Sequence, residues 1–296
     1  MNSVTSIINR EFTKDKYNIL LVMSPDILMD RLLCQTGHNF FSIPKWSGRE
    51  MWGREIDKPD NLEFFLENPP IYIDFDFIVV HNRTDGYSVG EQLSHNLHIP
   101  LVCLNEISAK LFQNSPQFSS IKNRQGHFSV YSDQNILESW GQVGPVIRPG
   151  ISPVFNKEGK RGERILMLFP RDKKQEEMIK IINKEFPVEF LCGRNEEDLA
   201  KQYKECGVFV DINGPEFYLS TIYALACGLE VVSGGRVENK SYVNNISINT
   251  LGDFFRLIKE KMENPQLNSL EFNSLENYNR EMYYLFDLAG KKIYER

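Results

Sequence analysis

The sequence lacks paired cysteines, long apolar runs and an excess of basic residues, and each absence excludes a class of protein. Its five cysteines are scattered, with no Cys-x-x-Cys spacing, which is typical of a reducing compartment and not of a disulfide framework. No run of about 18 apolar residues occurs, so we expect no transmembrane segment. Residues 1–16 lack the apolar centre of a secretion signal, so we expect a cytoplasmic protein.

Metal-binding and nucleic-acid-binding signatures are also scarce. The five histidines form no HExxH or similar metal spacing. Asp74-Phe-Asp76 matches a metal-binding Asp-x-Asp pattern, but Asp76 is better explained as the entry to a buried strand, so we expect no metal. The formal net charge is −6, which disfavours tight non-specific binding to nucleic acid without excluding it.

In the first half of the chain, short β-rich apolar runs alternate with segments of helical periodicity. Residues 44–60 contain two Trp, two Pro and two Gly and are expected to be a loop. This alternation predicts a doubly wound parallel sheet. The expected strands are 17–23, 39–43, 76–81, 99–104, 127–131 and 145–148, and the expected helices are 26–35, 89–96 and 134–140.

A Pro- and Gly-rich stretch, residues 149–163, marks the expected domain boundary, after which the alternation restarts. We therefore expect two Rossmann-like domains, 1–150 and 151–275, facing across a cleft, and a terminal helix, 276–296, that packs back on the first domain. The expected strands of the second domain are 164–169, 188–192, 208–212 and 230–233. Its expected helices are 173–185, 196–205, 217–226 and 251–262.

The second domain has the clearest chemical pattern. A strand leads into Asn213-Gly214-Pro215, and the helix that follows begins with its backbone N–H groups unpaired, which favours an anion. Arg171, Lys173 and Lys174 come just after another strand, where cations could bind a diphosphate. A dinucleotide oxidoreductase is disfavoured, because Ser24-Pro25-Asp26 stands where a Gly-x-Gly-x-x-Gly turn would follow the first strand.

Several segments, in order along the chain, resemble B-fold (GT-B) glycosyltransferases, in particular their large retaining family. Tyr223-Ala-Leu-Ala-Cys-Gly-Leu-Glu-Val-Val232 is similar to that family's Ala-Met-Ala-Cys-Gly-x-Pro-Val-Val pattern. Phe169-Pro-Arg-Asp-Lys-Lys174, Glu189-Phe-Leu-Cys-Gly-Arg194 and Ile147-Arg-Pro-Gly-Ile-Ser-Pro-Val-Phe155 are similar to its other segments. The chain departs from the family's acidic pair: Tyr223 stands at the second acidic position, and Glu216 lies one residue after the first.

The resemblance implies a metal-independent, retaining glycosyltransferase that uses a nucleotide sugar, such as a UDP- or GDP-sugar. The acceptor would be a glycan, a protein or a modified nucleobase. The expected catalytic residues are Glu216, His81 and Asn105. The residues expected to bind the nucleotide sugar are Arg171, Lys173, Lys174, Gly193, Arg194, Gly214, Tyr218 and Tyr223. The missing acidic residue supports an alternative: a catalytically degenerate binding module that keeps the fold.

Overall fold

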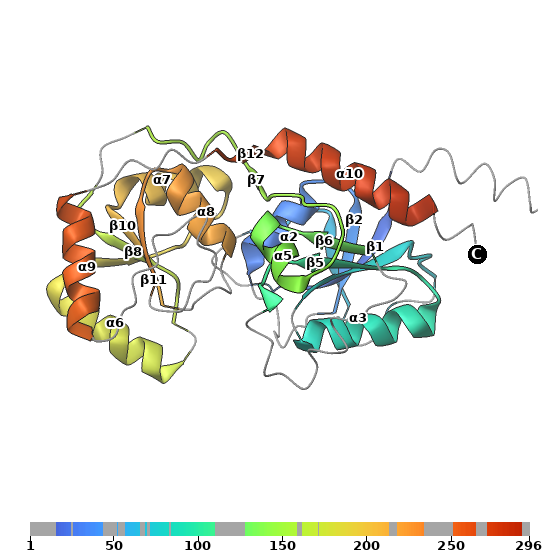
Figure 1. The fold of residues 1–296 in the computed structure, drawn as a ribbon, viewed down its shortest axis with the longest axis horizontal. Coiled ribbons are helices and arrows are strands. Elements are labelled where there is room, and N and C mark those ends of the chain that lie inside the picture. Colours follow the sequence, from blue (N-terminus) through green and yellow to red (C-terminus); the bar gives the residue numbers. More distant parts are fainter. Residues whose placement is uncertain are drawn as a thin grey trace, which may run out of the picture. The chain divides into compact units, whose positions relative to one another are not determined.

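The chain forms two compact units, described here in a computed structural model (Figure 1). Unit 1 comprises Met1–Trp52, Lys58–Ile147 and Tyr278–Arg296, and unit 2 comprises Gly53–Asp57 and Arg148–Asn277. The structure describes residues 16–24, 26–43, 52, 57–65, 69, 72–82, 84–109, 128–158, 162–170, 172–212, 218–233, 251–264 and 271–291. For Thr84, Asp85, Tyr218, Leu251 and Lys291 it describes the backbone alone.

Unit 1 contains a six-stranded parallel sheet in the order β3-β2-β1-β4-β5-β6. The two central strands, β1 and β4, are almost entirely buried, as expected for a sheet covered on both faces. The strands are β1 (Asn18–Val22), β2 (Asn39–Ser42), β3 (Leu62–Phe64), β4 (Phe77–His81), β5 (Leu101–Asn105) and β6 (Phe128–Tyr131).

Helices cover both faces of this sheet. Helix α3 (Thr84–Leu97) lies on one face, and α10 (Leu275–Lys291) lies on the other (Figure 1). A Cβ atom on Gly90 of α3 would come within 2.2 Å of Val80 Cγ1, so glycine allows the helix to approach the sheet closely. On the opposite face, Phe286 of α10 packs on Phe77, with ring centroids 5.1 Å apart. Helices α2 (Ile27–Cys34) and α5 (Gln134–Trp140) complete the unit.

Unit 2 contains a four-stranded parallel sheet in the order β11-β10-β8-β9. Helices α6 (Lys173–Glu185) and α9 (Leu251–Glu263) supply Ile179, Ile182 and Phe254 to the core on one face. Helices α7 (Glu196–Glu205) and α8 (Tyr218–Ala226) lie on the other face (Figure 1). The strands are β8 (Ile165–Met167), β9 (Val188–Phe190), β10 (Val208–Asp211) and β11 (Glu230–Ser233).

A short parallel pairing joins the predicted boundary stretch to the residues just before the last helix. β7 (Gly150–Ile151) pairs with β12 (Asn273–Ser274), and Asn273 Nδ2 donates to the carbonyl of Arg148 at 2.9 Å. Helix α10 then continues into unit 1, where the Tyr17 hydroxyl donates to Asp287 Oδ1 at 3.1 Å. The last helix is therefore packed against the first strand, some 270 positions away in the sequence.

The sequence-based predictions differ from the structure in one helix and two strands. Helix α3 begins at Thr84, five residues before the helix expected at 89–96. The strand expected at 145–148 is wrong: only an isolated bridge between Val146 and Tyr131 forms there. The short edge strand β3 was not predicted, because three residues carry too little periodicity to separate a strand from a loop. Within the described ranges, no helix has the length and apolar character needed to cross a membrane.

Candidate functional site

The strand order of unit 1 places a topological switch point between β1 and β4. Chain connections run toward β2 and β3 on one side and toward β5 and β6 on the other. In open α/β sheets, ligands bind beyond the carboxyl ends of the strands at such a point. Here those ends are Val22 of β1 and His81 of β4, so the predicted residue His81 lies at the expected location.

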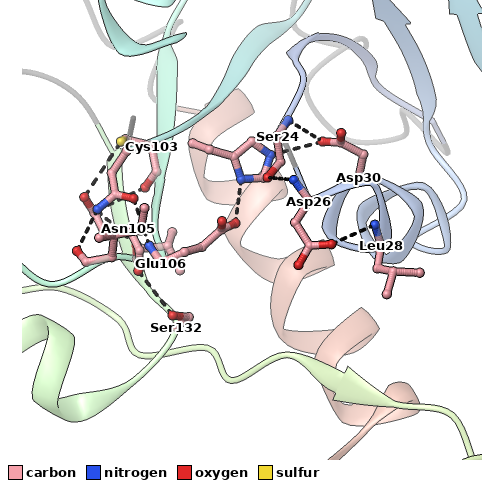
Figure 2. Close-up of polar contacts among 12 residues, drawn as sticks. Ser24, Asp26, Leu28, Asp30, Cys103, Asn105, Glu106 and Ser132 are labelled. Atoms are coloured by element: carbon pink, nitrogen blue, oxygen red, sulfur yellow. Dashed lines mark hydrogen bonds and ion pairs between the residues drawn. The ribbon is translucent and has the colours of Figure 1, made fainter. Parts of the chain in front are cut away.

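His81 is held between the carboxylates of Glu106 and Asp30, which are labelled in Figure 2. Its Nδ1 atom lies 2.5 Å from Glu106 Oε1, just after β5, and its Nε2 atom lies 3.2 Å from Asp30 Oδ1 on α2. All three side chains are buried, and Asp30 is 0% exposed. Because both ring nitrogens contact carboxylates, the arrangement favours the doubly protonated imidazolium, which donates on both sides.

The electrostatics of this cluster favour that charged form. Burial by itself lowers the pKa of His81, but the charge of Glu106, hydrogen bonds to Asp30 and Glu106, and the charge of Asp30 together raise it to about 10. A histidine with this pKa keeps its proton at neutral pH. It therefore acts as a fixed cation and hydrogen-bond donor, and it is poorly suited to be a general base.

The same cluster organises the turn between β1 and α2. Ser24 N donates to Asp30 Oδ1 at 3.0 Å, and Asp26 N donates to Ser24 Oγ at 3.0 Å. Asp26 is the N-cap of α2, and its carboxylate accepts from Leu28 N at 3.1 Å (Figure 2). Asp30 thus links His81 to the backbone of the turn, which stands where a dinucleotide-binding protein would carry its glycines.

The predicted catalytic residue Asn105 lies at the end of β5, next to the cluster. Its amide nitrogen donates to the carbonyls of Val130 and Cys103, at 3.1 and 3.3 Å, and the side chain is 2% exposed. Nearby, Glu106 N donates to Asn82 Oδ1, and Asn82 Nδ2 donates to Ile107 O. These contacts fix the loop after β5. The described hydrogen bonds give Asn105 a structural role, and its catalytic role stays a prediction.

The switch point of unit 2 lies between β8 and β10. Lys173 and Lys174 begin α6 there and are exposed. Asp172 caps the helix: its side chain accepts from Gln175 N at 2.8 Å, so a carboxylate already occupies part of the positive helix end. The two ammonium groups are the cations that the structure describes at this point. Arg171, Gly214 and Glu216 lie outside the described residues.

The predicted residues Gly193 and Arg194 follow β9, on the same edge. Gly193 is buried, and a Cβ atom there would come within 2.8 Å of Leu199 N, so glycine is needed for α7 to pack. Arg194 is exposed. The first turn of α7 carries three acidic residues, Glu196, Glu197 and Asp198. Because these charges repel phosphate, this corner suits a base or ribose better than a diphosphate.

Tyr223 lies inside unit 2 and is 3% exposed. Its ring stacks on Phe155, with centroids 4.0 Å apart and an interplanar angle of 9°. The described contacts give it a packing role, and its predicted contact with the nucleotide sugar stays a prediction. Tyr218 is the first residue of α8.

Sequence reasoning missed Asp30, the second partner of His81. The only signal was a carboxylate within the apolar stretch of α2, where Met29 and Leu32 are buried beside it. Such a residue needs a buried partner, but the sequence does not identify which one. In the parts of the chain that the structure describes, no group of three or more His, Cys, Asp or Glu side chains is arranged to hold a metal ion.

Neither protein-family models nor curated protein sequences match the chain, but solved structures do. Anabaena HepE, solved in complex with UDP-glucose, is 12% identical, with a TM-score of 0.57 over 95% of this chain and 99% of that one. S. aureus MnaA, solved with UDP, is 10% identical, with a TM-score of 0.56 over 91% and 97%. A UDP-N-acetylglucosamine 2-epimerase is 11% identical, with a TM-score of 0.55 over 93% and 97%.

At these identities the likeness shows the fold alone. The fold is that of GT-B glycosyltransferases and UDP-N-acetylglucosamine 2-epimerases, which confirms the α/β GT-B fold implied by the sequence resemblance. The likeness extends over nearly the whole of both chains.

Proposed function

We propose that the protein is a glycosyltransferase that transfers a sugar from a nucleotide sugar, in the first place a UDP-sugar, to a hydroxyl-bearing acceptor. The observation that carries this proposal is the near full-length likeness to a structure that holds UDP-glucose. Support from this chain comes from two exposed cations at the carboxyl edge of unit 2, Lys173 and Lys174. Cations at this position would stabilise the charge that develops on a departing diphosphate.

In this proposal the two units have separate tasks. Unit 2 binds the nucleotide, and unit 1 receives the acceptor at the carboxyl edge that contains His81. An imidazolium flanked by Asp30 and Glu106 gives this edge more carboxylate than cationic groups. A neutral hydroxyl of a glycan or protein is therefore a better acceptor than a phosphate. As the resemblance implies, we propose transfer with retention and without a metal.

Epimerisation of the sugar is the second candidate function. Two of the three structures named above are a UDP-N-acetylglucosamine 2-epimerase and MnaA with UDP. An epimerase inverts a carbon of the sugar and needs no acceptor, whereas a transferase without its acceptor releases the nucleotide slowly by hydrolysis. A degenerate binding module would bind the nucleotide sugar and leave it unchanged.

One experiment separates these candidates. The protein is incubated with UDP-glucose, UDP-N-acetylglucosamine or GDP-mannose, with and without EDTA, and the sugar is followed by proton NMR. We expect slow release of UDP that is insensitive to EDTA, with the sugar configuration at C2 unchanged. A new C2 epimer would establish the epimerase instead, and line broadening without conversion would favour the binding module. Absence of binding to every donor would contradict the proposal.

A pair of variants tests the cationic edge. Changing Lys173 and Lys174 to alanine removes two charges from the start of α6, whereas changing Lys180 and Lys184 to alanine removes two exposed charges farther along the same helix. We expect the first pair to weaken UDP binding about tenfold or more and the second pair to leave it within about twofold. Equal effects would mean that the lysines act only through the overall charge.

A further inference from the structure

An aromatic pair at the carboxyl edge of unit 2 has one ring that is exposed to solvent. Phe169 lies two residues beyond the end of β8 and is 43% exposed. Its ring stacks on Phe190, the last residue of β9, with centroids 4.9 Å apart and an interplanar angle of 17°. Phe190 in turn packs against the core of the unit. The pair is thus a stack whose inner ring packs against the core and whose outer ring is exposed to solvent.

The exposure of this ring is unusual within its unit. Of the aromatic side chains that the structure describes in unit 2, Phe169 alone is exposed. Leaving a phenyl ring in water forgoes part of the roughly 1.5–3 kcal/mol that burial of such a side chain contributes. The core does not explain the ring's position, because Phe169 lies outside the cluster formed by the inward-facing residues of β8 and β10.

The surroundings of the ring favour an anionic ligand with a flat, uncharged part. Phe169 follows the strand at the switch point, where ligands bind in this type of sheet. Lys173 and Lys174 are exposed four and five positions later, and Arg194 is exposed four positions after Phe190. An aromatic face followed by two exposed lysines complements a nucleotide, whose base stacks while its phosphates bind the ammonium groups.

We propose that Phe169, supported by Phe190, is the platform on which the base of a nucleoside diphosphate stacks. This inference rests on the proposed function, because it specifies how the donor is held. The base would extend the stack as a third ring, which is favourable for any nucleobase because each has a π-face. Stacking therefore supplies affinity, while selection between uracil and other bases depends on groups at the edge of the ring.

The experiment measures binding of UMP, UDP and ribose 5-phosphate to the full-length protein by titration calorimetry. Phe169→Ala removes the ring, Phe169→Leu keeps apolar bulk without the ring, and Phe169→Tyr keeps the ring. Ile181→Ala is the control, since Ile181 is a 39% exposed apolar side chain on α6 of the same unit. Thermal unfolding of each variant verifies that it is folded.

We expect Phe169→Ala and Phe169→Leu to weaken UMP and UDP binding about 5- to 150-fold, with ribose 5-phosphate little affected. Phe169→Tyr and Ile181→Ala should bind like the wild type. In saturation-transfer NMR, the H5 and H6 protons of uracil should receive magnetisation in the wild type and lose it in Phe169→Ala.

Two outcomes would overturn the proposal, and they differ in whether the proposed function is contradicted as well. A wild-type protein that binds UDP, together with a folded Phe169→Ala variant of unchanged affinity, eliminates the platform and leaves the proposed function intact. A wild-type protein that binds no nucleotide eliminates both.

Discussion

Both units contain a parallel sheet with a switch point, but the charged groups at that point are buried in unit 1 and exposed in unit 2. In unit 1 the charged groups are buried: His81, Asp30 and Glu106 contact one another and are almost inaccessible to solvent. In unit 2 the charged groups at the equivalent edge, among them Lys173 and Lys174, are exposed. Buried, mutually paired charges fix a backbone geometry, whereas exposed charges are available to a ligand.

This contrast indicates that the charged groups at the two edges have different roles. Unit 1 has an edge at which buried ion pairs link His81, Asp30 and Glu106. Unit 2 has an edge with exposed cations and one exposed aromatic ring. Substitutions at the two edges should therefore differ: those in unit 1 should reduce stability, and those in unit 2 should reduce binding.

The largest effect is expected where α10 packs on unit 1. Phe286 is 0% exposed and packs on Phe77 and His38. Phe286→Ala should lower the free energy of unfolding by about 3–5 kcal/mol, because it leaves a cavity in the core. Urea denaturation measures the change. Tyr284→Ala, at a 65% exposed position of the same helix, should stay within about 0.5 kcal/mol of the wild type. Equal losses from both variants would show that α10 does not dock as described.

The buried cluster should come next, with a pH dependence of defined sign. Because the pKa of His81 is raised from 6.5 to about 10 in the folded protein, its contribution to stability is complete below pH 6.5 and is lost as the pH rises to 10. His81→Gln should cost about 3 kcal/mol at pH 6, since two buried carboxylates lose their cation. The deficit of the variant relative to the wild type should shrink toward pH 10 in urea titrations at several pH values. A deficit independent of pH would mean that His81 is neutral in the fold.

A smaller effect is expected at Gly193, where the sequence pattern predicts contact with the nucleotide. The alanine Cβ would come within 2.8 Å of Leu199 N and 2.9 Å of Leu199 Cγ. Gly193→Ala should therefore destabilise unit 2 by about 1–3 kcal/mol through overpacking, as seen in thermal unfolding. Arg194→Ala, at the exposed neighbouring position, should unfold like the wild type. If Gly193→Ala kept its stability and lost only UDP affinity, Gly193 would line the binding site instead.

The smallest effect is expected for the exposed ion pairs of unit 2. Arg164 pairs with Glu189 and, at 3.7 Å, with Glu205, and its side chain is 48% exposed. Arg164→Ala should cost at most about 1 kcal/mol, and the loss should fall further in 1 M salt because solvent screens the pair. A loss equal to that of His81→Gln would contradict the contrast between buried and exposed charge.

Local sequence patterns determined much of this fold. Helices α5, α6 and α7 begin and end at the predicted residues. Their starts are marked by the N-caps Asp133, Asp172 and Asn195, whose side chains accept from the first turn. The buried strands were recognisable as short β-rich runs, and their alternation with helices predicted two parallel sheets. The GT-B resemblance followed from segments in the right order, and the structural likeness confirmed the fold.

Only the tertiary structure decided which polar residues meet. Asp30, His81 and Glu106 come from α2, β4 and the end of β5, up to 76 positions apart, and they meet because parallel strands end at one edge of a sheet. The stacking of Phe169 on Phe190 likewise depends on β8 and β9 being neighbours. A sequence records helix periodicity and caps because these involve residues close together in the chain. Side-chain contacts across strands depend on the order and register of the whole sheet, which no local pattern specifies.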